Sequence, residues 1–244
     1  MRIETKTKVI ADMVGILETI VTDSRIQATK DKFVMRSGDA ANCAVITVTA
    51  SSDLFVKYEP SDEEIAVDIR KLNVVLSLID NSTVSSFYDV SDKKKFVVEN
   101  TTMKAGVKLI DTRTIKPWAM IPELKYTAIS TISGEDFVKG VRAVEKLGGE
   151  WVRFTISSGL LSMSYEDESV DIKREQPKTT LSNFVEGEAI SLYSVMYLTP
   201  LLKYLEKSLV KVETGINYPM RLTFVIDKSC CFEMVLAPRI ETGG

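Results

Sequence analysis

The chain of 244 residues repeats one pattern of helices and strands, and this repeat limits its possible folds more than any other feature. In each half an amphipathic helix comes first, a strand-rich region follows, and a second short helix precedes paired strands. The predicted helices lie near Lys8–Val21 and Arg70–Ile79, and again near Gly134–Leu147 and Val195–Lys207. The displacement of roughly 120 to 130 residues has the size of one domain. The sequence therefore predicts two copies of one domain.

The composition is typical of a compact two-domain protein. Hydrophobic residues make up 45% of the chain and charged residues 27%, so each half can bury a core of its own. No apolar run approaches the roughly 18 residues of a membrane span, and the N-terminus lacks the apolar stretch of a signal peptide. We therefore expect a cytoplasmic protein.

Few residues of the chain could support catalysis. It has no histidine, which removes the commonest general base and most zinc sites. Cys43, Cys230 and Cys231 have neither the number of a disulfide framework nor the spacing of metal ligands. The acidic clusters Asp62–Glu64 and Glu166–Glu168 are expected in turns, where charges are usually solvated. We therefore expect no catalytic site, no metal and no cofactor, and no glycine-rich phosphate loop is present.

The predicted third helix has one apolar face and one basic face. Ser133 and Asp136 at its start resemble a capping box. Lys139, Arg142 and Lys146 share the face opposite the apolar stripe. This face is either a binding surface or an ordinary solvated surface, because acidic residues lie close by.

The predicted fourth helix is interrupted by Pro200. Proline removes a backbone hydrogen bond from a helix interior but is well suited to the first helical position. The helix is therefore either kinked there or restarts with Thr199 as its N-cap.

Alternating apolar and polar residues predict antiparallel strands. Ala44–Ala50 alternates cleanly, Ser82–Val90 and Phe96–Ile110 have the pattern of long ribbons, and Arg221–Ile226 pairs with Phe232–Leu236. Each half is expected to form an antiparallel sheet with two helices on one face, which makes the fold class α+β.

A segment with two prolines separates the halves. We place the first domain at 1–111, a connector at 112–126 and the second domain at 127–244. Trp118, Met120 and Ile121 in the connector have little local structure to bury them. They either pack on the neighbouring sheet or dock a partner.

The end of the chain resembles a known family. Met234–Glu241 is similar to the terminal segment of sliding clamps of the proliferating cell nuclear antigen (PCNA) type. Ser133–Phe137, Gly38–Asp39, Ile121–Glu123 and Tyr218–Met220 match the family in order. The resemblance covers essentially the whole chain, and it is closer to archaeal and eukaryotic clamps than to the longer bacterial ones.

The resemblance implies a DNA-clamp fold with two duplicated domains, each with antiparallel sheets and two helices. Three copies would form a pseudo-six-fold ring around double-stranded DNA without reading its sequence. Such a clamp is a processivity factor for DNA polymerase, has no catalytic activity, and recruits replication and repair enzymes. Flap endonuclease, DNA ligase and the clamp loader, replication factor C, would bind through peptide motifs with a glutamine, an aliphatic residue and two aromatics. The protein would act at the nucleoid in an archaeon or in the nucleus of a eukaryote.

The resemblance also implies three sets of site residues. The DNA-binding set consists of cations on the four predicted helices: Lys8, Arg70, Lys71, Lys139, Arg142, Lys146, Lys203 and Lys207. The partner-peptide groove would use residues of the connector and of three flanking segments: Gly38, Asn42, Val45, Ala119, Met120, Ile121, Pro122, Pro219, Leu236, Ala237, Pro238 and Ile240. The subunit interface would pair Lys104–Leu109 with Asp171–Gln176, through Lys104, Val107, Leu109, Asp171, Ile172, Lys173 and Arg174.

The charge of the chain fits a ring better than a tight DNA binder. It has 31 basic and 34 acidic residues, a net charge of -3, so three copies would repel DNA on average. A few cations per subunit give an attraction that weakens as salt rises. Retention on DNA would therefore come from the topology of the closed ring.

Two alternatives to this function stay open. The nearer one is a subunit of a heteromeric or checkpoint-type clamp, and the more distant one is a carboxylate-dependent hydrolase.

Overall fold

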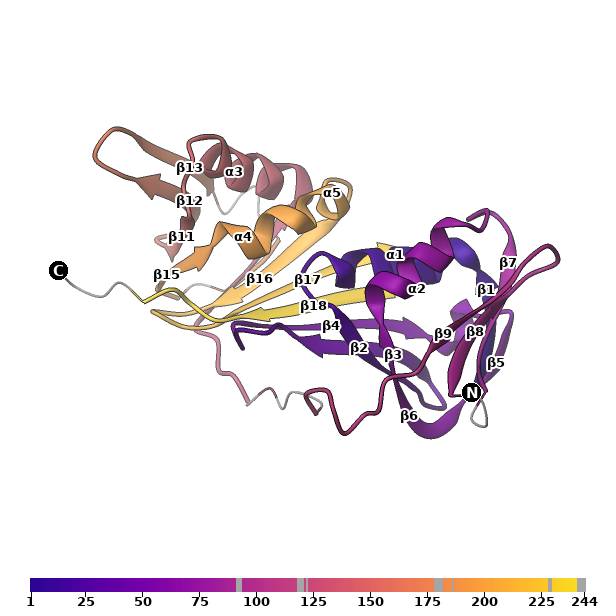
Figure 1. The fold of residues 1–244 in the computed structure, drawn as a ribbon. Coiled ribbons are helices and arrows are strands. Elements are labelled where there is room, and N and C mark those ends of the chain that lie inside the picture. Colours follow the sequence, from indigo (N-terminus) through magenta and orange to yellow (C-terminus); the bar gives the residue numbers. More distant parts are fainter. Residues whose placement is uncertain are drawn as a thin grey trace. The chain divides into compact units, whose positions relative to one another are not determined.

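The same order of elements occurs twice along the chain (Figure 1). The computed structural model describes residues 1–90, 94–117, 121, 123–177, 182–185, 187–227 and 230–240. The chain divides into unit 1, with Met1–Met120 and Ile226–Phe232, and unit 2, with Ile121–Val225 and Glu233–Gly244. Within the described residues of each half, a strand enters the first helix, five strands follow, and a second helical segment precedes three more strands. The predicted duplication is confirmed.

The first half contains two antiparallel sheets. Its strands are β1 (Arg2–Lys6), β2 (Asp23–Ala28), β3 (Lys32–Gly38), β4 (Ala44–Ser51), β5 (Lys57–Glu59), β6 (Ser61–Asp68), β7 (Val84–Val90), β8 (Lys95–Glu99) and β9 (Lys104–Lys108). One sheet has the order β5-β1-β7-β8-β9, and the other strands follow the order β4-β3-β2-β6. The helices are α1 (Thr7–Glu18) and α2 (Ile69–Ser77), with a short 3-10 turn, η1, at Ser52–Leu54.

The second half repeats this arrangement. Its strands are β10 (Ala128–Ser133), β11 (Trp151–Ser157), β12 (Leu160–Glu166), β13 (Asp171–Pro177), β14 (Ser182–Val185), β15 (Ala189–Ser194), β16 (Leu209–Thr214), β17 (Met220–Asp227) and β18 (Cys230–Leu236). One run of paired strands has the order β14-β10-β16-β17-β18 and the other the order β13-β12-β11-β15. Two sheets per half correct the expectation of one sheet, because the five strands between the helices divide between two layers.

The helices of unit 1 pack side by side and are buried along one face (Figure 1). In α1, Ile10, Met13 and Leu17 are almost fully buried at the spacing of one helical stripe. In α2, the carboxylate of Asp68 accepts the backbone N–H of Lys71 at 2.9 Å and so caps the helix N-terminus. Burial of these large apolar side chains stabilises the fold by about 1.5 to 3 kcal/mol each.

Helix α3 (Gly134–Lys146) in unit 2 has the cap that its sequence predicts. The Ser133 hydroxyl oxygen accepts the Asp136 N–H at 3.1 Å, and the hydroxyl donates to the Asp136 carboxylate at 2.8 Å. The helix ends at Gly148, which has a left-handed backbone with φ 77°, a conformation that costs glycine little. Its N–H donates to the Glu145 carbonyl at 3.0 Å. Both boundaries of α3 are therefore set by local chemistry.

Pro200 changes the fourth helical segment without breaking its path. The chain runs through α4 (Val195–Leu198), the 3-10 turn η4 (Thr199–Leu201) and α5 (Leu202–Leu205). Because Pro200 has no N–H, it cannot make the α-helical bond, and the tighter 3-10 turn takes its place. Thr199 has helical backbone angles, and its hydroxyl has no hydrogen-bond partner among the described residues. The predicted restart with Thr199 as N-cap is therefore wrong.

The core of unit 2 is built around aromatic rings. The rings of Phe137 and Phe154 lie 5.8 Å apart, and Tyr193 lies 5.8 Å from Phe154 at an edge-to-face angle. Burial raises the pKa of Tyr193, whose hydroxyl donates to the Tyr218 carbonyl at 2.7 Å and so satisfies its polar end inside the core.

Among the described residues, no helix is both long enough and apolar enough to cross a membrane.

Replacing Gly134 with alanine should destabilise unit 2 strongly. The added Cβ would lie 1.7 Å from the Leu205 carbonyl oxygen and 2.7 Å from that of Ser208. Backbone atoms cannot move aside as a flexible side chain can, so we expect a loss of about 3 kcal/mol or more in the free energy of unfolding. Gly38→Ala is the control, because its Cβ would meet only the Ala44 carbonyl oxygen at 3.6 Å. Equal thermal midpoints for the two variants would contradict the close packing of α3 on α5.

Candidate nucleic-acid interface and assembly edges

All eight cations predicted for DNA contact are exposed on helices or directly after one. They are Lys8 on α1, Arg70 and Lys71 on α2, Lys139, Arg142 and Lys146 on α3, Lys203 on α5, and Lys207 after α5. Each lies opposite the buried stripe of its helix, so none is needed for the core. These side chains are therefore available for contact with a charged ligand within each unit.

Three of these cations are partly neutralised by neighbours on their own helix. Lys8 forms an ion pair with Asp12, and Lys139 forms one with Glu135, both at i,i+4 spacing. The Lys71 ammonium lies 3.4 Å from the Asp68 carboxylate. Exposed pairs of this kind add little stability, but each reduces the local positive charge.

Five cations have no ion pair within the ranges that the structure describes: Arg70, Arg142, Lys146, Lys203 and Lys207. In unit 2, Gly134 at the start of α3 lies against the end of α5, since its N–H donates to the Ser208 carbonyl at 2.7 Å. Lys207 therefore lies near the first turn of α3, while Lys146 lies in the last. Free positive charge is thus spread along the helix pair, as contacts to a phosphate backbone require.

Two predicted interface strands lie at sheet edges, as expected. β9 is the last strand of its five-stranded sheet, and β13 is the last strand of its four-stranded sheet. An edge strand has a row of backbone groups without partners in the sheet, which can pair with another strand. β9 in unit 1 and β13 in unit 2 can therefore each pair with a further strand.

The register identifies which backbone groups point outward from β9. The Leu109 N–H donates to the Lys94 carbonyl at 2.8 Å, and Asn100 donates to Met103 at 2.9 Å. In an antiparallel pair, directly hydrogen-bonded residues alternate with residues whose groups face away. The outward groups of β9 therefore belong to Lys104, Gly106 and Lys108.

The same reasoning applies to β13. The Asp167 N–H donates to the Val170 carbonyl at 2.9 Å, which sets the alternation along the hairpin with β12. The outward backbone groups of β13 belong to Asp171, Lys173 and Glu175. Their side chains are exposed, as are those of Lys104 and Lys108 on β9.

The remaining interface residues pack inward or sideways within their own unit. Val107 is buried, and Leu109 lies just past β9, where it forms a bridge to Val67 of β6. Ile172 is half-buried on β13. The Arg174 guanidinium donates to the Asp136 carboxylate at 2.7 Å, and this hydrogen bond is the main cause of the lowered pKa of Asp136. Arg174 thus ties β13 to the first turn of α3.

The second acidic cluster closes the turn that leads into β13. The Asp167 carboxylate accepts the Ser169 N–H at 2.7 Å, the Ser169 hydroxyl at 2.8 Å and the Val170 N–H at 2.9 Å. These bonds, first that from the Ser169 backbone, lower the pKa of Asp167 to about 2. The first cluster, Asp62–Glu64, lies in β6 and not in the predicted turn. The described residues contain no group of three or more acidic or cysteine side chains placed to hold a metal.

Some of the predicted groove residues belong to unit 1 and the others to unit 2. In unit 1, Gly38 and Asn42 lie at the β3–β4 turn and Val45 on β4. In unit 2, Leu236 is buried, Ile240 is 73% exposed, and Ile121, Pro219, Ala237 and Pro238 are half-buried. Ala119, Met120 and Pro122 lie outside the described residues.

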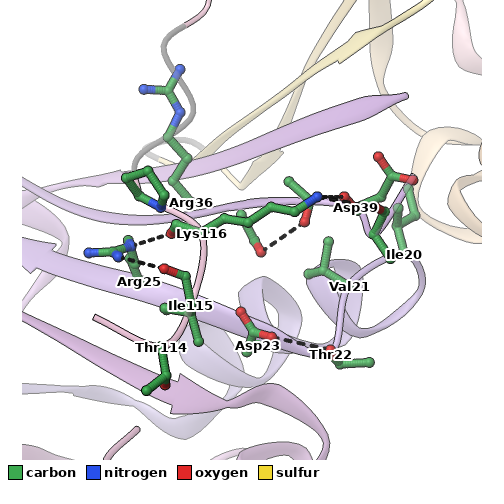
Figure 2. Close-up of a pocket in the computed structure, with 14 residues that line it drawn as sticks. Ile20, Val21, Thr22, Asp23, Arg25, Arg36, Asp39, Thr114, Ile115 and Lys116 are labelled. Atoms are coloured by element: carbon green, nitrogen blue, oxygen red, sulfur yellow. Dashed lines mark hydrogen bonds between the residues drawn. The ribbon is translucent and has the colours of Figure 1, made fainter. Parts of the chain in front are cut away.

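A pocket in unit 1 lies under the start of the connector (Figure 2). It has a volume of about 270 Å³ and is bounded by Ile20–Asp23, by Arg25 and Arg36, and by Thr114–Pro117. Two cations beside it attach the connector to unit 1: Arg25 donates to the carbonyl oxygen of Lys116, and the Lys116 ammonium donates to the carbonyl oxygen of Asp39. Sequence reasoning missed Arg25, since an arginine on the outer face of a strand has no distinctive local pattern.

No protein-family model matches the chain, but individual proteins match along nearly all of it. The DNA polymerase sliding clamp of Methanothrix thermoacetophila is 27% identical over 231 residues, 94% of each chain. That of Methanococcoides burtonii is 24% identical over 95% of each chain. Among solved structures, the A. fulgidus PCNA with the C-terminal region of FEN-1 bound is 26% identical, with a TM-score of 0.92 over 99% of both chains. The PCNA of Thermococcus kodakaraensis, at 21% identity and a TM-score of 0.86, shares the fold.

Removing the Asp167 carboxylate should loosen the hairpin that carries β13. We expect Asp167→Ala to speed hydrogen exchange at Ser169, Val170 and along β13, because three hydrogen bonds of the turn lose their carboxylate acceptor. Glu168→Ala is the matched control, since its exposed neighbouring carboxylate makes none of these bonds.

The wild-type turn should also respond to acid. A folded-state pKa below the ordinary value contributes stability above the ordinary pKa, and this contribution is lost as the pH falls toward about 2. Exchange in the wild type should therefore approach that of Asp167→Ala below about pH 3. Equal exchange in all three proteins at neutral pH would contradict the role of Asp167.

Proposed function

We propose that this chain, which is a PCNA-type DNA polymerase sliding clamp in sequence and in fold, encircles double-stranded DNA as a ring of three copies. The whole-chain likeness to DNA polymerase sliding clamps, in sequence and in backbone, supports this function most directly. The clamp would tether the replicative polymerase and so act as a processivity factor. It would also recruit other replication and repair enzymes to the same DNA.

The two free edges support a head-to-tail ring. β9 of one copy would pair with β13 of the next, and each copy would then have one edge of each kind occupied. The outward side chains favour this pairing, since β9 offers Lys104 and Lys108 while β13 offers Asp171 and Glu175 beside Lys173. Because the two edges differ, the contact is head-to-tail, and three copies would close it into a ring.

A proline on the outer side of β13 should separate the copies without unfolding them. Lys173 points its N–H outward, and proline is tolerated on an edge strand at such a position. Lys173→Pro should therefore shift the native mass from three times 27.2 kDa to 27.2 kDa, measured by light scattering across a dilution series. Lys173→Ala keeps the N–H and should remain trimeric.

Two outcomes would change this account of assembly. A trimeric Lys173→Pro variant would contradict the pairing through β13. A wild-type chain that is already monomeric would instead favour a heteromeric clamp, in which sister subunits supply the neighbouring edges.

The exposed helix cations are proposed as the DNA-facing surface. The five cations without ion pairs should contribute most, because Lys8, Lys71 and Lys139 already have acidic neighbours on their own helices. Contacts of this kind reach phosphates and leave the bases unread, so the ring would slide. Their number is small, so the attraction would be weak and sensitive to salt.

Charge reversal at two of the free cations should weaken DNA association. We expect Arg142→Glu with Lys146→Glu to lower affinity for duplex DNA by about tenfold at low salt and to flatten its salt dependence. The control is Lys30→Glu with Lys32→Glu, which changes net charge equally at the exposed β2–β3 turn. Affinity measured by fluorescence anisotropy should fall only in the helix variant, with the trimer mass unchanged. An equal fall in both would mean that net charge, not this face, governs binding.

Partner enzymes are proposed to dock through short peptides at the connector and the C-terminal segment. The related A. fulgidus PCNA was solved with the C-terminal region of FEN-1 bound, which supports a peptide-docking site in this chain. Flap endonuclease, DNA ligase, polymerase and the clamp loader would share this site. An exposed Ile240 beside half-buried Pro238 offers apolar surface to aromatic side chains of such a peptide.

The proposed clamp performs no chemistry of its own. ATP would be used by the separate loader, and the domains would be 1–111 and 127–244 with the connector 112–126 between them. Its place would be on the DNA of the nucleoid, in the cytoplasm of an archaeal cell, as the archaeal sources of the similar clamps suggest.

A further inference from the structure

The first part of the connector is fixed to the outer strands of unit 1. The Ile110 N–H donates to the Ala66 carbonyl of β6 at 2.8 Å. The carboxylate of Asp111 then accepts the Arg113 N–H at 3.0 Å, and its carbonyl accepts the Thr114 N–H at 2.8 Å, which makes a turn. The residues after this turn lie beside β2, because the Ile115 and Lys116 carbonyl oxygens both accept from Arg25.

Arg25 of β2 holds the next stretch by three backbone carbonyls, of which those of Ile115 and Lys116 are drawn in Figure 2. Its Nε donates to the Lys116 oxygen at 2.6 Å, and its Nη2 donates to the oxygens of Thr112 at 2.5 Å and Ile115 at 3.1 Å. Its Nη1 is paired with the Glu64 carboxylate of β6. The side chain of Arg25 is only 11% exposed, so these bonds are partly shielded from water.

Lys116 extends the attachment to the β3–β4 turn. Its ammonium donates to the Asp39 carbonyl at 2.7 Å, the Ala40 carbonyl at 3.2 Å and the Asn42 side-chain oxygen at 2.6 Å. These three bonds use all three ammonium protons. Asn42 has a positive φ of 60°, which orients its side chain within this turn. The connector is thus held at two successive points by cations that bind neutral oxygens.

Arg25 is suited to this attachment by the shape of its side chain. Arg25 lies opposite Arg36 in the β2–β3 register, and the Glu64 carboxylate pairs with Arg25. The planar fork of arginine lets Arg25 reach three connector carbonyls at once from β2, which a shorter or neutral side chain could not do.

We propose that Arg25 is the positioning residue of the partner-docking site, with Lys116 as its second anchor. By fixing the connector as far as Lys116, Arg25 reduces the ordering that a partner peptide must otherwise impose on binding. It would act through the connector and not by touching the peptide. This inference rests on the proposed docking of partner peptides at the connector.

The proposal is tested with four variants and two measurements. Arg25→Ala removes the fork, Arg25→Lys keeps the charge but not the fork, and Glu64→Gln removes only the ion pair. Arg113→Ala is the control, because Arg113 lies on the same connector but its side chain pairs, among the described residues, only with the exposed Asp111. One measurement is hydrogen exchange at residues 110–117. The other is the affinity of each trimer for a synthetic peptide with one glutamine, one aliphatic residue and two adjacent aromatics.

We expect exchange at 110–117 to rise and peptide affinity to fall by about tenfold in Arg25→Ala, the size of losing charged hydrogen bonds. Arg25→Lys should fail to rescue either property, while Glu64→Gln and Arg113→Ala should stay within about twofold of the wild type. A purely structural role would lower thermal stability and leave the affinity of the folded trimer unchanged.

The outcomes separate the two proposals. Faster exchange with unchanged affinity would overturn the positioning role, and so would full rescue by Arg25→Lys. Unchanged exchange in Arg25→Ala would overturn it even without a peptide. If the wild type itself binds no peptide, the docking function fails, while exchange at 110–117 still reports whether Arg25 holds the connector.

Discussion

The proposed ring depends on the unpaired backbone of two edge strands. β9 and β13 each have outward N–H and C=O groups at every second residue, and an edge of this kind invites another strand. In a monomer such edges are a liability for aggregation. In a head-to-tail ring each is occupied by its counterpart on the neighbouring copy, and no edge of these two kinds remains open. Features that support these strands, such as the Asp167 turn and the Arg174–Asp136 pair, therefore support assembly as well.

The distribution of charge agrees with retention by topology. A net charge of -3 for each copy opposes binding to DNA, and several helix cations are already paired with acidic neighbours. The remaining cations can guide a duplex without holding it tightly, because each contributes a phosphate contact that salt weakens. A protein that must stay on DNA and still move along it is well served by weak contacts inside a closed path. At the connector, Arg25 and Lys116 also act locally, because they hold backbone carbonyl oxygens of unit 1.

The sequence predicted the features that depend on local chemistry. Ser133 caps α3, and the alternating pattern of Ala44–Ala50 placed β4, because each signal acts within a few residues. It failed where distant residues decide. Asp62–Glu64 lie in β6, which pairs with β2. Pro200 lies in the 3-10 turn η4, between the helical segments α4 and α5. Arg25 was missed because its partners Thr112, Ile115 and Lys116 are far away in sequence. The whole-chain family resemblance supplied the candidate site residues that periodicity alone could not assign.

The central claim is that the protein stays on DNA because the ring is closed around it. The most direct test is to let the trimer thread onto a linear duplex, block both DNA ends with bulky protein, and measure retention at high salt before and after one internal cut with a nuclease. The account predicts that the blocked duplex retains the protein and that cutting releases it by sliding off the new ends. Rapid loss at high salt from blocked and cut DNA alike would contradict it.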